Sequence, residues 1–178
     1  MRGRWLAAVT ALLLAESAWA ALATTWEMDF DDDKKSWKEL EAQLPAYPKA
    51  NLVLMDMGAT PHQFYVDPAS VSIGADGVTR YTAVVKAAGG AVNVTFEGMR
   101  CETREHKLYA LGHNDGTWAR ARDPQWKFIT AREMPSHYVM LFRDFMCPSR
   151  YLLPEPRNVV AALKRGEPIS PTTQNRGD

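Results

Sequence analysis

The densest group of side chains that could do chemistry is Arg100, Glu102, Arg104 and His106, which occur at every second residue. In a continuous strand alternate residues share one face, so these four side chains would line up together. Two guanidinium groups could then hold an anionic ligand, with a carboxylate and an imidazole beside them. A hairpin tip over 103–107, with its charges solvated, is the preferred interpretation of the same stretch. The four residues are therefore a candidate binding patch.

The sequence carries few other signs of a catalytic or metal site. Its histidines never occur at the H-x-H or H-E-x-x-H spacing of zinc sites; they are His62, His106, His113 and His137. Asp29, Asp31 and Asp33 have the first spacings of a calcium loop, but the glycine and the glutamate that such a loop needs later are absent. No serine lies in a G-x-S-x-G motif, and no glycine-rich loop precedes a helix. We therefore expect no catalytic residue, no metal and no cofactor.

Cys101 and Cys147 are the only two cysteines of the chain. Outside the cytosol an even pair favours one disulfide, whereas a redox pair favours C-x-x-C spacing and a zinc site needs more ligands. The loop that the bond would close is long, so the bond would contribute on the order of 4 kcal/mol. Because Cys101 ends a predicted strand and Cys147 ends a predicted helix, the bond would attach that helix to the sheet.

The first twenty residues have the pattern of a secretory signal peptide. Arg2 and Arg4 precede an apolar run over 5–15, and a small-residue cleavage motif ends at Ala20. Cleavage after Ala23 fits the same motif. The apolar run is shorter than the roughly 18–20 residues of a membrane-spanning helix, so we expect no membrane span. The mature chain is expected to be soluble and periplasmic or secreted.

The charge balance argues against two classes of partner. The chain has 21 Lys and Arg residues and 21 Asp and Glu residues, a formal net charge of zero. Such a chain lacks the positive field that binding to nucleic acid or to anionic lipid requires. We expect a monomer whose partner is an envelope component or protein of unknown identity.

Composition and pattern divide the chain into four parts: a signal peptide over 1–20, a polar segment over 21–35, a single domain over 36–166 and a disordered tail over 167–178. The domain begins with Ser36 and Glu39 in the order of a capping box. This box predicts a short helix that ends at about Leu44, before two prolines.

Residues 51–130 contain short runs in which apolar and polar side chains alternate, as is typical of strands. Turn signals separate these runs at Asp76-Gly77, Gly89-Gly90 and Asn114-Asp115-Gly116. Gly98 within one run indicates a bulge or a close backbone contact. Short strands with tight turns predict an antiparallel meander sheet of about five to seven strands.

Helical spacing returns near the end of the chain. One apolar stripe predicts a helix over 136–147; it consists of Tyr138, Leu141, Phe142, Phe145 and Met146. A last helix is predicted from the prolines Pro154 and Pro156 to Arg165, with Gly166 just after its C-terminus. The fold class is therefore α+β, with C-terminal helices that cover one face of the sheet.

Several blocks of the sequence resemble those of a known protein family: residues 64–67, 70–72, 76–82, 90–101, 109–110, 115–118 and 145–148. The most specific run is NVTFEGMRCETR at 93–104. Together these blocks resemble the cryptic neisserial protein-like family (CNP-like domain) of small, uncharacterised exported bacterial proteins. The resemblance covers roughly residues 36–165. It implies a bacterial, exported, single-domain protein and assigns no catalytic residue.

We expect a non-catalytic accessory or ligand-binding module of the cell envelope. The alternative is a small envelope hydrolase in which Glu102 and His106 act as acid and base, while Arg100 or Arg104 holds an anion. A third hypothesis is that an exposed edge of the sheet pairs with a protein partner.

Overall fold

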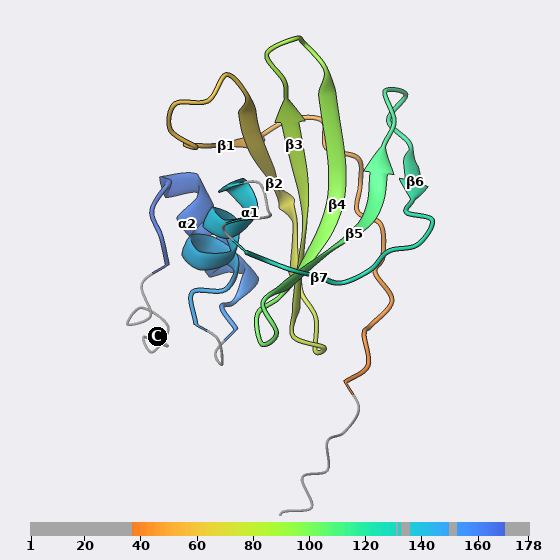
Figure 1. The fold of residues 1–178 in the computed structure, drawn as a ribbon, viewed down its shortest axis with the longest axis vertical. Helices are drawn as coiled ribbons and strands as arrows, with labels where there is room; N and C mark the ends of the chain where they lie inside the picture. The colour runs from red at the N-terminus through yellow and green to blue at the C-terminus, as the bar shows by residue number, and fades with distance from the viewer. Residues whose placement is uncertain (1–36, 131, 133–135, 150–152, 170–178) are drawn as a thin grey trace, which may run out of the picture. The chain divides into compact units, whose positions relative to one another are not determined.

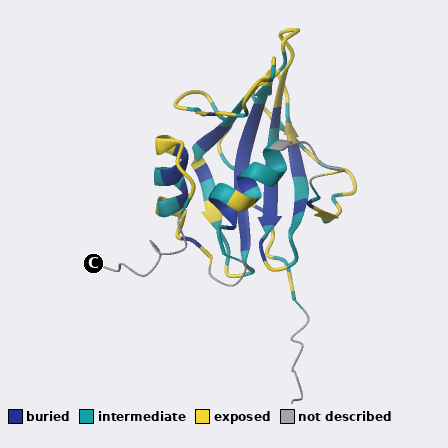
Figure 2. Cartoon of the chain, turned by 60° about the vertical axis from the view of Figure 1, so that its left-hand side comes forward, coloured by how far each residue is buried: buried dark blue, intermediate teal, exposed yellow. Residues whose placement is uncertain are grey.

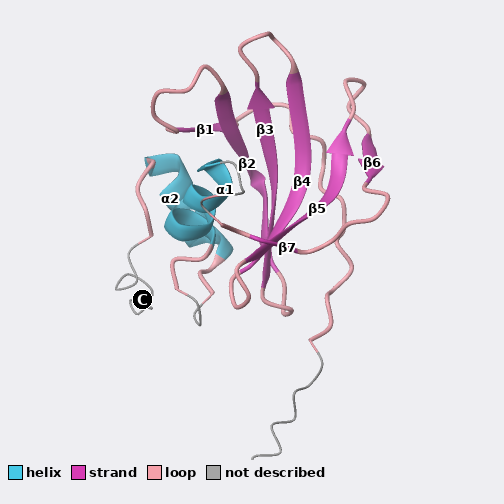
Figure 3. Ribbon diagram, viewed as in Figure 1, coloured by secondary structure: helices cyan, strands magenta, loops and turns pink. Residues whose placement is uncertain are grey.

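Within the described residues, seven strands form one antiparallel sheet (Figure 1). The computed structural model describes residues 37–130, 132, 136–149 and 153–169. The strands are β1 Val53–Met55, β2 Gln63–Ile73, β3 Val78–Lys86, β4 Val92–Arg100, β5 Glu105–Gly112, β6 Trp118–Arg120 and β7 Lys127–Phe128. The helices are α1 Ser136–Met140, the π-helix η1 Leu141–Met146 and α2 Pro156–Arg165 (Figure 3). All of these elements belong to one compact unit that begins at Lys38.

The strands follow one another across the sheet in chain order. β1 to β6 are neighbours both in sequence and in space, every pair is antiparallel, and β7 pairs with the first residues of β5. The turns between strands are short because Gly77 and Gly116 adopt φ angles of 75° and 85°, which residues with a Cβ rarely adopt. The predicted α+β fold with an antiparallel meander is confirmed. The predicted signal peptide, both of its cleavage sites and the segment over 21–35 lie outside the described residues.

The helices cover one face of the sheet. α2 packs on β2 and β1 and buries Val159, Ala162 and Leu163, while η1 buries Leu141, Phe145 and Met146. Figure 2 shows buried residues along the middle of the strands and exposed residues at the hairpin tips. As predicted, α2 ends at Arg165 and is capped by Gly166, which has a left-handed conformation with a φ of 68°.

An irregular segment covers the opposite face. Residues 38–49 form neither helix nor strand, so the helix predicted over 36–44 is wrong; Ser36 itself lies outside the described residues. Ala42 of this segment packs in a second apolar core with Phe96, Tyr109 and Ala110. A helix does not form because side chains of the sheet bind the segment's backbone and the Glu39 carboxylate, which was expected to cap that helix.

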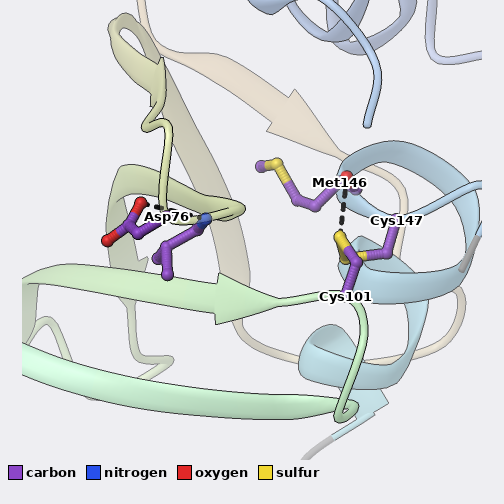
Figure 4. The surroundings of a disulfide bond; sticks show 5 residues. Asp76, Cys101, Met146 and Cys147 are labelled. Atoms are coloured by element: carbon purple, nitrogen blue, oxygen red, sulfur yellow. Dashed lines mark hydrogen bonds between the residues drawn. A yellow bond between two sulfur atoms is a disulfide. The ribbon is translucent and has the colours of Figure 1, made fainter. Parts of the chain in front are cut away.

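The disulfide between Cys101 and Cys147 joins the sheet to the helices, as predicted. The two Cα atoms are 5.3 Å apart, and the bond connects residues separated by 46 positions. Cys101 directly follows β4 and Cys147 directly follows η1 (Figure 4). The predicted helix over 136–147 is only partly α-helical: the Cys147 N–H donates to the Phe142 carbonyl, five residues earlier.

Gly98 provides the close contact that its place within a strand indicated. The register of β4 and β5 shifts between Phe96 and Glu97, which places a bulge beside Gly98. A Cβ at Gly98 would lie 2.7 Å from the Tyr109 hydroxyl and from one of its ring carbons. Gly98 therefore lets the Tyr109 ring lie on the sheet, where it packs with Phe96 at 5.5 Å between ring centroids.

We predict that Gly98→Ala lowers the free energy of unfolding by about 1–3 kcal/mol, because the new methyl group overlaps the Tyr109 ring. Urea unfolding of the oxidised protein measures this change. The matched control is Gly89→Ala in the β3–β4 turn, where a Cβ meets nothing within 4 Å and which should cost less than about 0.5 kcal/mol. Equal losses for the two variants would contradict the assigned packing.

Candidate functional site

The structure separates the four residues of the candidate binding patch. Arg100 ends β4, residues 101–104 form the hairpin turn, and His106 lies in β5. Arg100 donates to Glu102 at 3.0 Å, and the Glu102 side chain is 71% exposed. The Arg104 guanidinium instead lies 5.7 Å from the Phe142 ring centroid, and His106 is buried. The turn thus lies at 101–104 and not at 103–107, and of the four side chains only that of Glu102 is exposed to solvent.

A cleft of about 580 Å³ lies on the other side of the sheet, between residues 38–42 and the strands β5 and β6. Its other wall comes from Lys107, Tyr109, Arg120, Ala121 and Pro124. The volume falls within the range of roughly 300–1,000 Å³ that is typical of small-molecule sites. The cleft carries side chains of both charges, because Lys107 and Arg120 face Glu39 and Glu41 across it.

Glu39 organises the floor of this cleft. Its Oε1 accepts from the Tyr109 hydroxyl at 2.8 Å, and its Oε2 accepts from Lys107 Nζ at 2.8 Å and from Trp126 Nε1 at 3.1 Å. Burial raises the pKa of Glu39, but these hydrogen bonds outweigh burial, so the pKa lies below its ordinary value. Burial and the neighbouring Glu39 carboxylate both raise the pKa of Tyr109, which therefore stays protonated and donates.

Lys107 is enclosed as well as paired. Its ammonium lies 5.7 Å from the Tyr109 ring centroid and 5.5 Å from that of Trp126, within the range of cation–π attraction. The floor of the cleft is thus a neutral group in which the Glu39 carboxylate accepts three hydrogen bonds. The charges that remain at the rim are Lys38, which is exposed, and the loose pair of Arg120 and Glu41, whose atoms are 4.0 Å apart.

A buried ion pair fixes the wall of the cleft. Asp76, in the turn before β3, accepts the Leu40 N–H at 2.9 Å and Arg80 Nη2 at 2.6 Å, and Arg80 Nη2 also donates to the Leu40 carbonyl at 2.9 Å. The side chains of Arg80 and Asp76 are 7% and 1% exposed. Burial raises the pKa of Asp76, but the hydrogen bonds from Arg80 and Leu40 outweigh it and hold the pKa below its ordinary value. Both backbone groups of Leu40 are therefore held by one ion pair.

A second polar group, the Glu97 cluster, lies buried on the helix face of the sheet. Glu97 is 2% exposed, and its carboxyl accepts from the hydroxyls of Tyr81 at 2.8 Å, Thr95 at 2.6 Å and Tyr138 at 3.1 Å. Burial raises the pKa of Glu97 above its ordinary value, although these three hydrogen bonds act in the opposite direction. The cluster joins β3, β4 and α1 across the core.

Four rings stack beside this cluster. The centroid distances are 4.8 Å from Phe64 to His137, 4.2 Å from His137 to Tyr138 and 4.3 Å from Tyr138 to His106. Both ring nitrogens of His106 and Nδ1 of His137 are buried without a hydrogen-bond partner. Burial lowers the pKa of both histidines, that of His137 to about 4, and the nearby Lys127 lowers that of His106 further.

The family model described as CNP1-like family matches residues 32–164. The chain belongs to the CNP1-like family. The matched region includes all seven described strands, both cysteines and nearly all of α2. The resemblance that the blocks around 93–104 indicated is thus confirmed. No curated protein and no solved structure gives a significant match to the chain.

Among the residues that the structure describes, no group of three or more His, Cys, Asp or Glu side chains is placed to hold a metal ion. Nor does any helix in that part of the chain combine the length and the apolar character needed to cross a membrane.

Sequence reasoning missed Glu39 and Glu97 as the centres of the two polar groups in this CNP1-like domain. Glu39 matched a capping box, a local pattern that tertiary partners overrode. Glu97 lay in a run where its neighbours Thr95 and Asn93 suggested a solvated face. One signal was available: Tyr81 and Tyr138 both lie in apolar stripes, and a buried tyrosine hydroxyl needs an acceptor.

We predict that Asp76→Asn lowers the free energy of unfolding by about 3 kcal/mol, because it leaves the Arg80 guanidinium buried without its counter-charge. Residues 38–47 should also become susceptible to limited proteolysis, since the Leu40 peptide loses its charged anchor. Urea unfolding and mapping of the first cleavage site measure both effects.

The matched control is Glu167→Ala, which removes a pair with Arg165 whose side chains are 58% and 70% exposed. Such a pair contributes about 0–1 kcal/mol, so the control should change stability little and leave the segment protected. A loss for Asp76→Asn no larger than that of the control would disprove the anchoring role.

Proposed function

We propose that this member of the CNP1-like family is an exported, non-catalytic ligand-binding or accessory module of the bacterial cell envelope. The observation that carries the binding role is the cleft of about 580 Å³ between residues 38–42 and the strands β5 and β6. Export is supported by the signal-peptide pattern over 1–20 and by the disulfide between Cys101 and Cys147.

The cleft is preorganised for binding. One wall is an irregular segment, but Asp76 and Arg80 hold its backbone at Leu40 and Trp118 Nε1 donates to the Pro45 carbonyl at 3.0 Å. A wall held in this way loses little conformational entropy when a ligand binds. The ligand therefore meets a surface whose shape is set before binding.

The charges at the cleft favour a small polar ligand that carries both an anionic and a cationic group. Lys38 and Arg120 can meet a carboxylate or a phosphate, and Glu41 can meet an ammonium. The floor is already neutralised, because Lys107 is paired with Glu39 at 2.8 Å. An amino acid, a short peptide or an amino sugar has the matching chemistry.

A non-catalytic role is favoured over the hydrolase because of where the proposed acid and base lie. Glu102 is at the hairpin tip, with its side chain 71% exposed and paired with Arg100. His106 is buried against the Tyr138 ring beneath α1. General acid–base catalysis requires both groups within hydrogen-bond reach of one substrate, and the opposite environments of these two residues argue against such a site.

For export, we predict that bacterial expression of the full chain yields a mature protein whose N-terminus follows Ala20 or Ala23 and whose two cysteines resist alkylation until a reductant is added. N-terminal sequencing and mass spectrometry after maleimide treatment measure both properties. A variant without residues 2–20 is the control and should retain two alkylatable thiols in the cytosol. An intact N-terminus with both thiols free in the wild-type protein would contradict export.

For binding, we predict that at least one compound from a panel of amino acids, dipeptides, amino sugars and simple carboxylates raises the melting temperature of the wild-type protein in a dose-dependent way. Ala121→Trp, which places a large ring in the cleft, should abolish the shift. Lys164→Met on α2 is exposed and distant from the cleft lining, so this variant should keep it.

Two outcomes would overturn the binding role. One is a wild-type protein that no compound in the panel stabilises, and the other is a shift that Ala121→Trp retains. Turnover of any panel compound, detected by mass spectrometry of the products, would instead support an enzyme.

A further inference from the structure

Helix α1 is the weakly held end of the helical layer. In its described part, residues 137–140 are only half-buried, whereas η1 directly after it buries Leu141, Phe145 and Met146. η1 is also tied covalently to the end of β4 through Cys147. α1 can therefore leave the sheet while η1 remains in place.

Besides the packing of Val139 and Met140 on the apolar core, two interactions attach α1 to the sheet. Tyr138 donates to Glu97 at 3.1 Å, and the stack of rings places Tyr138 between His137 and His106, at 4.2 Å and 4.3 Å. His137 also packs on Phe64 of β2 at 4.8 Å. In this stack both histidine rings lie against aromatic rings. Such an apolar environment disfavours a positively charged imidazole.

We propose that α1 is an acid-released lid: protonation of His106 and His137 detaches it from the sheet and uncovers the Glu97 cluster, while the disulfide keeps η1 attached. This role is separate from ligand binding in the cleft, which lies on the opposite face of the sheet. It adds a conformational response to ambient pH, which an exported chain would experience directly.

The groups around the two histidines make protonation unfavourable while α1 is closed. β7 contributes Lys127, a like charge that pairs in register with His106, and the hairpin turn contributes Arg104 against Phe142 of η1. β3 and α1 contribute the neutral hydroxyls of Tyr81 and Tyr138. Glu97 of β4 is the acidic group of the cluster, and the like charge of a protonated His106 further lowers the pKa of His137.

The pH dependence of α1 closure follows from the lowered pKa values of His106 and His137. Burial lowers the pKa of His137 to about 4 in the closed state, and that of His106 lies below its ordinary value of 6.5. The open state, in which both rings are solvated, therefore binds more protons in this range. The closed state is fully favoured above about pH 6.5 and loses its advantage as the pH falls toward 4.

Glu97 opposes this release. Burial raises its pKa in the closed state, so the closed state binds more protons at this carboxyl and gains stability as the pH falls. Removing this titration should therefore leave the acid release intact or increase it. A Glu97 variant therefore shows whether the acid release of α1 is caused by the histidines or by Glu97.

The test is hydrogen–deuterium exchange of the purified, oxidised protein, with protection factors corrected for the pH dependence of intrinsic exchange. Between about pH 7.5 and about pH 4.5 we expect the protection of the α1 amides to fall at least about tenfold, while that of β3 and β4 changes less than about twofold. The double variant His106→Phe/His137→Phe should keep α1 protected throughout. Glu97→Gln and the exposed His113→Phe should both retain the acid release.

A second measurement covers the case in which the double variant does not fold. NMR titration of the wild-type histidine rings should show His106 and His137 changing together with the loss of α1 protection. Histidines that titrate while α1 stays protected would overturn the proposal. So would a loss of protection shared equally by α1 and β3, or acid release that persists in the double variant.

Discussion

A sheet that is buried on both faces needs a cover on each, and a cover without regular structure must find partners for its own backbone groups. In β3 every residue from Val78 to Val84 is buried, so neither face can be left to solvent. Residues 38–49 provide one cover without helix or strand. Their position depends on side chains of the sheet and its turns, above all on the ion pair of Asp76 and Arg80 that holds both backbone groups of Leu40.

The helix face satisfies its polar groups differently. Glu97 accepts three hydroxyl groups in the core and so joins strands to α1, while the disulfide joins the end of β4 to the end of η1. The disulfide cysteines do not titrate, whereas the stacked histidines do. One helical layer thus has a permanent attachment at one end and a titratable attachment at the other.

The two faces suggest a division of roles in this member of the CNP1-like family. The cleft beside Glu39 is preorganised and partly exposed, which suits binding. The Glu97 cluster is buried, and its carboxyl accepts three hydrogen bonds. This arrangement suits a structural element that changes conformation only when the ambient pH changes. The patch of Arg100, Glu102, Arg104 and His106 lacks such organisation, because the hairpin turn sends these side chains into different environments.

The sequence by itself determined the strands and turns, the cysteine pair and the cap at Gly166, because periodicity, D-G turns and glycine caps are local signals. It could not determine the course of residues 38–49 or the roles of Glu39 and Glu97. The hydrogen-bond partners of residues 38–49 lie between 36 and 87 positions away in the chain. Only the assembled sheet brings Tyr109 and Trp126 to Glu39, and their hydrogen bonds then outweigh the capping box at Ser36 that favoured a helix.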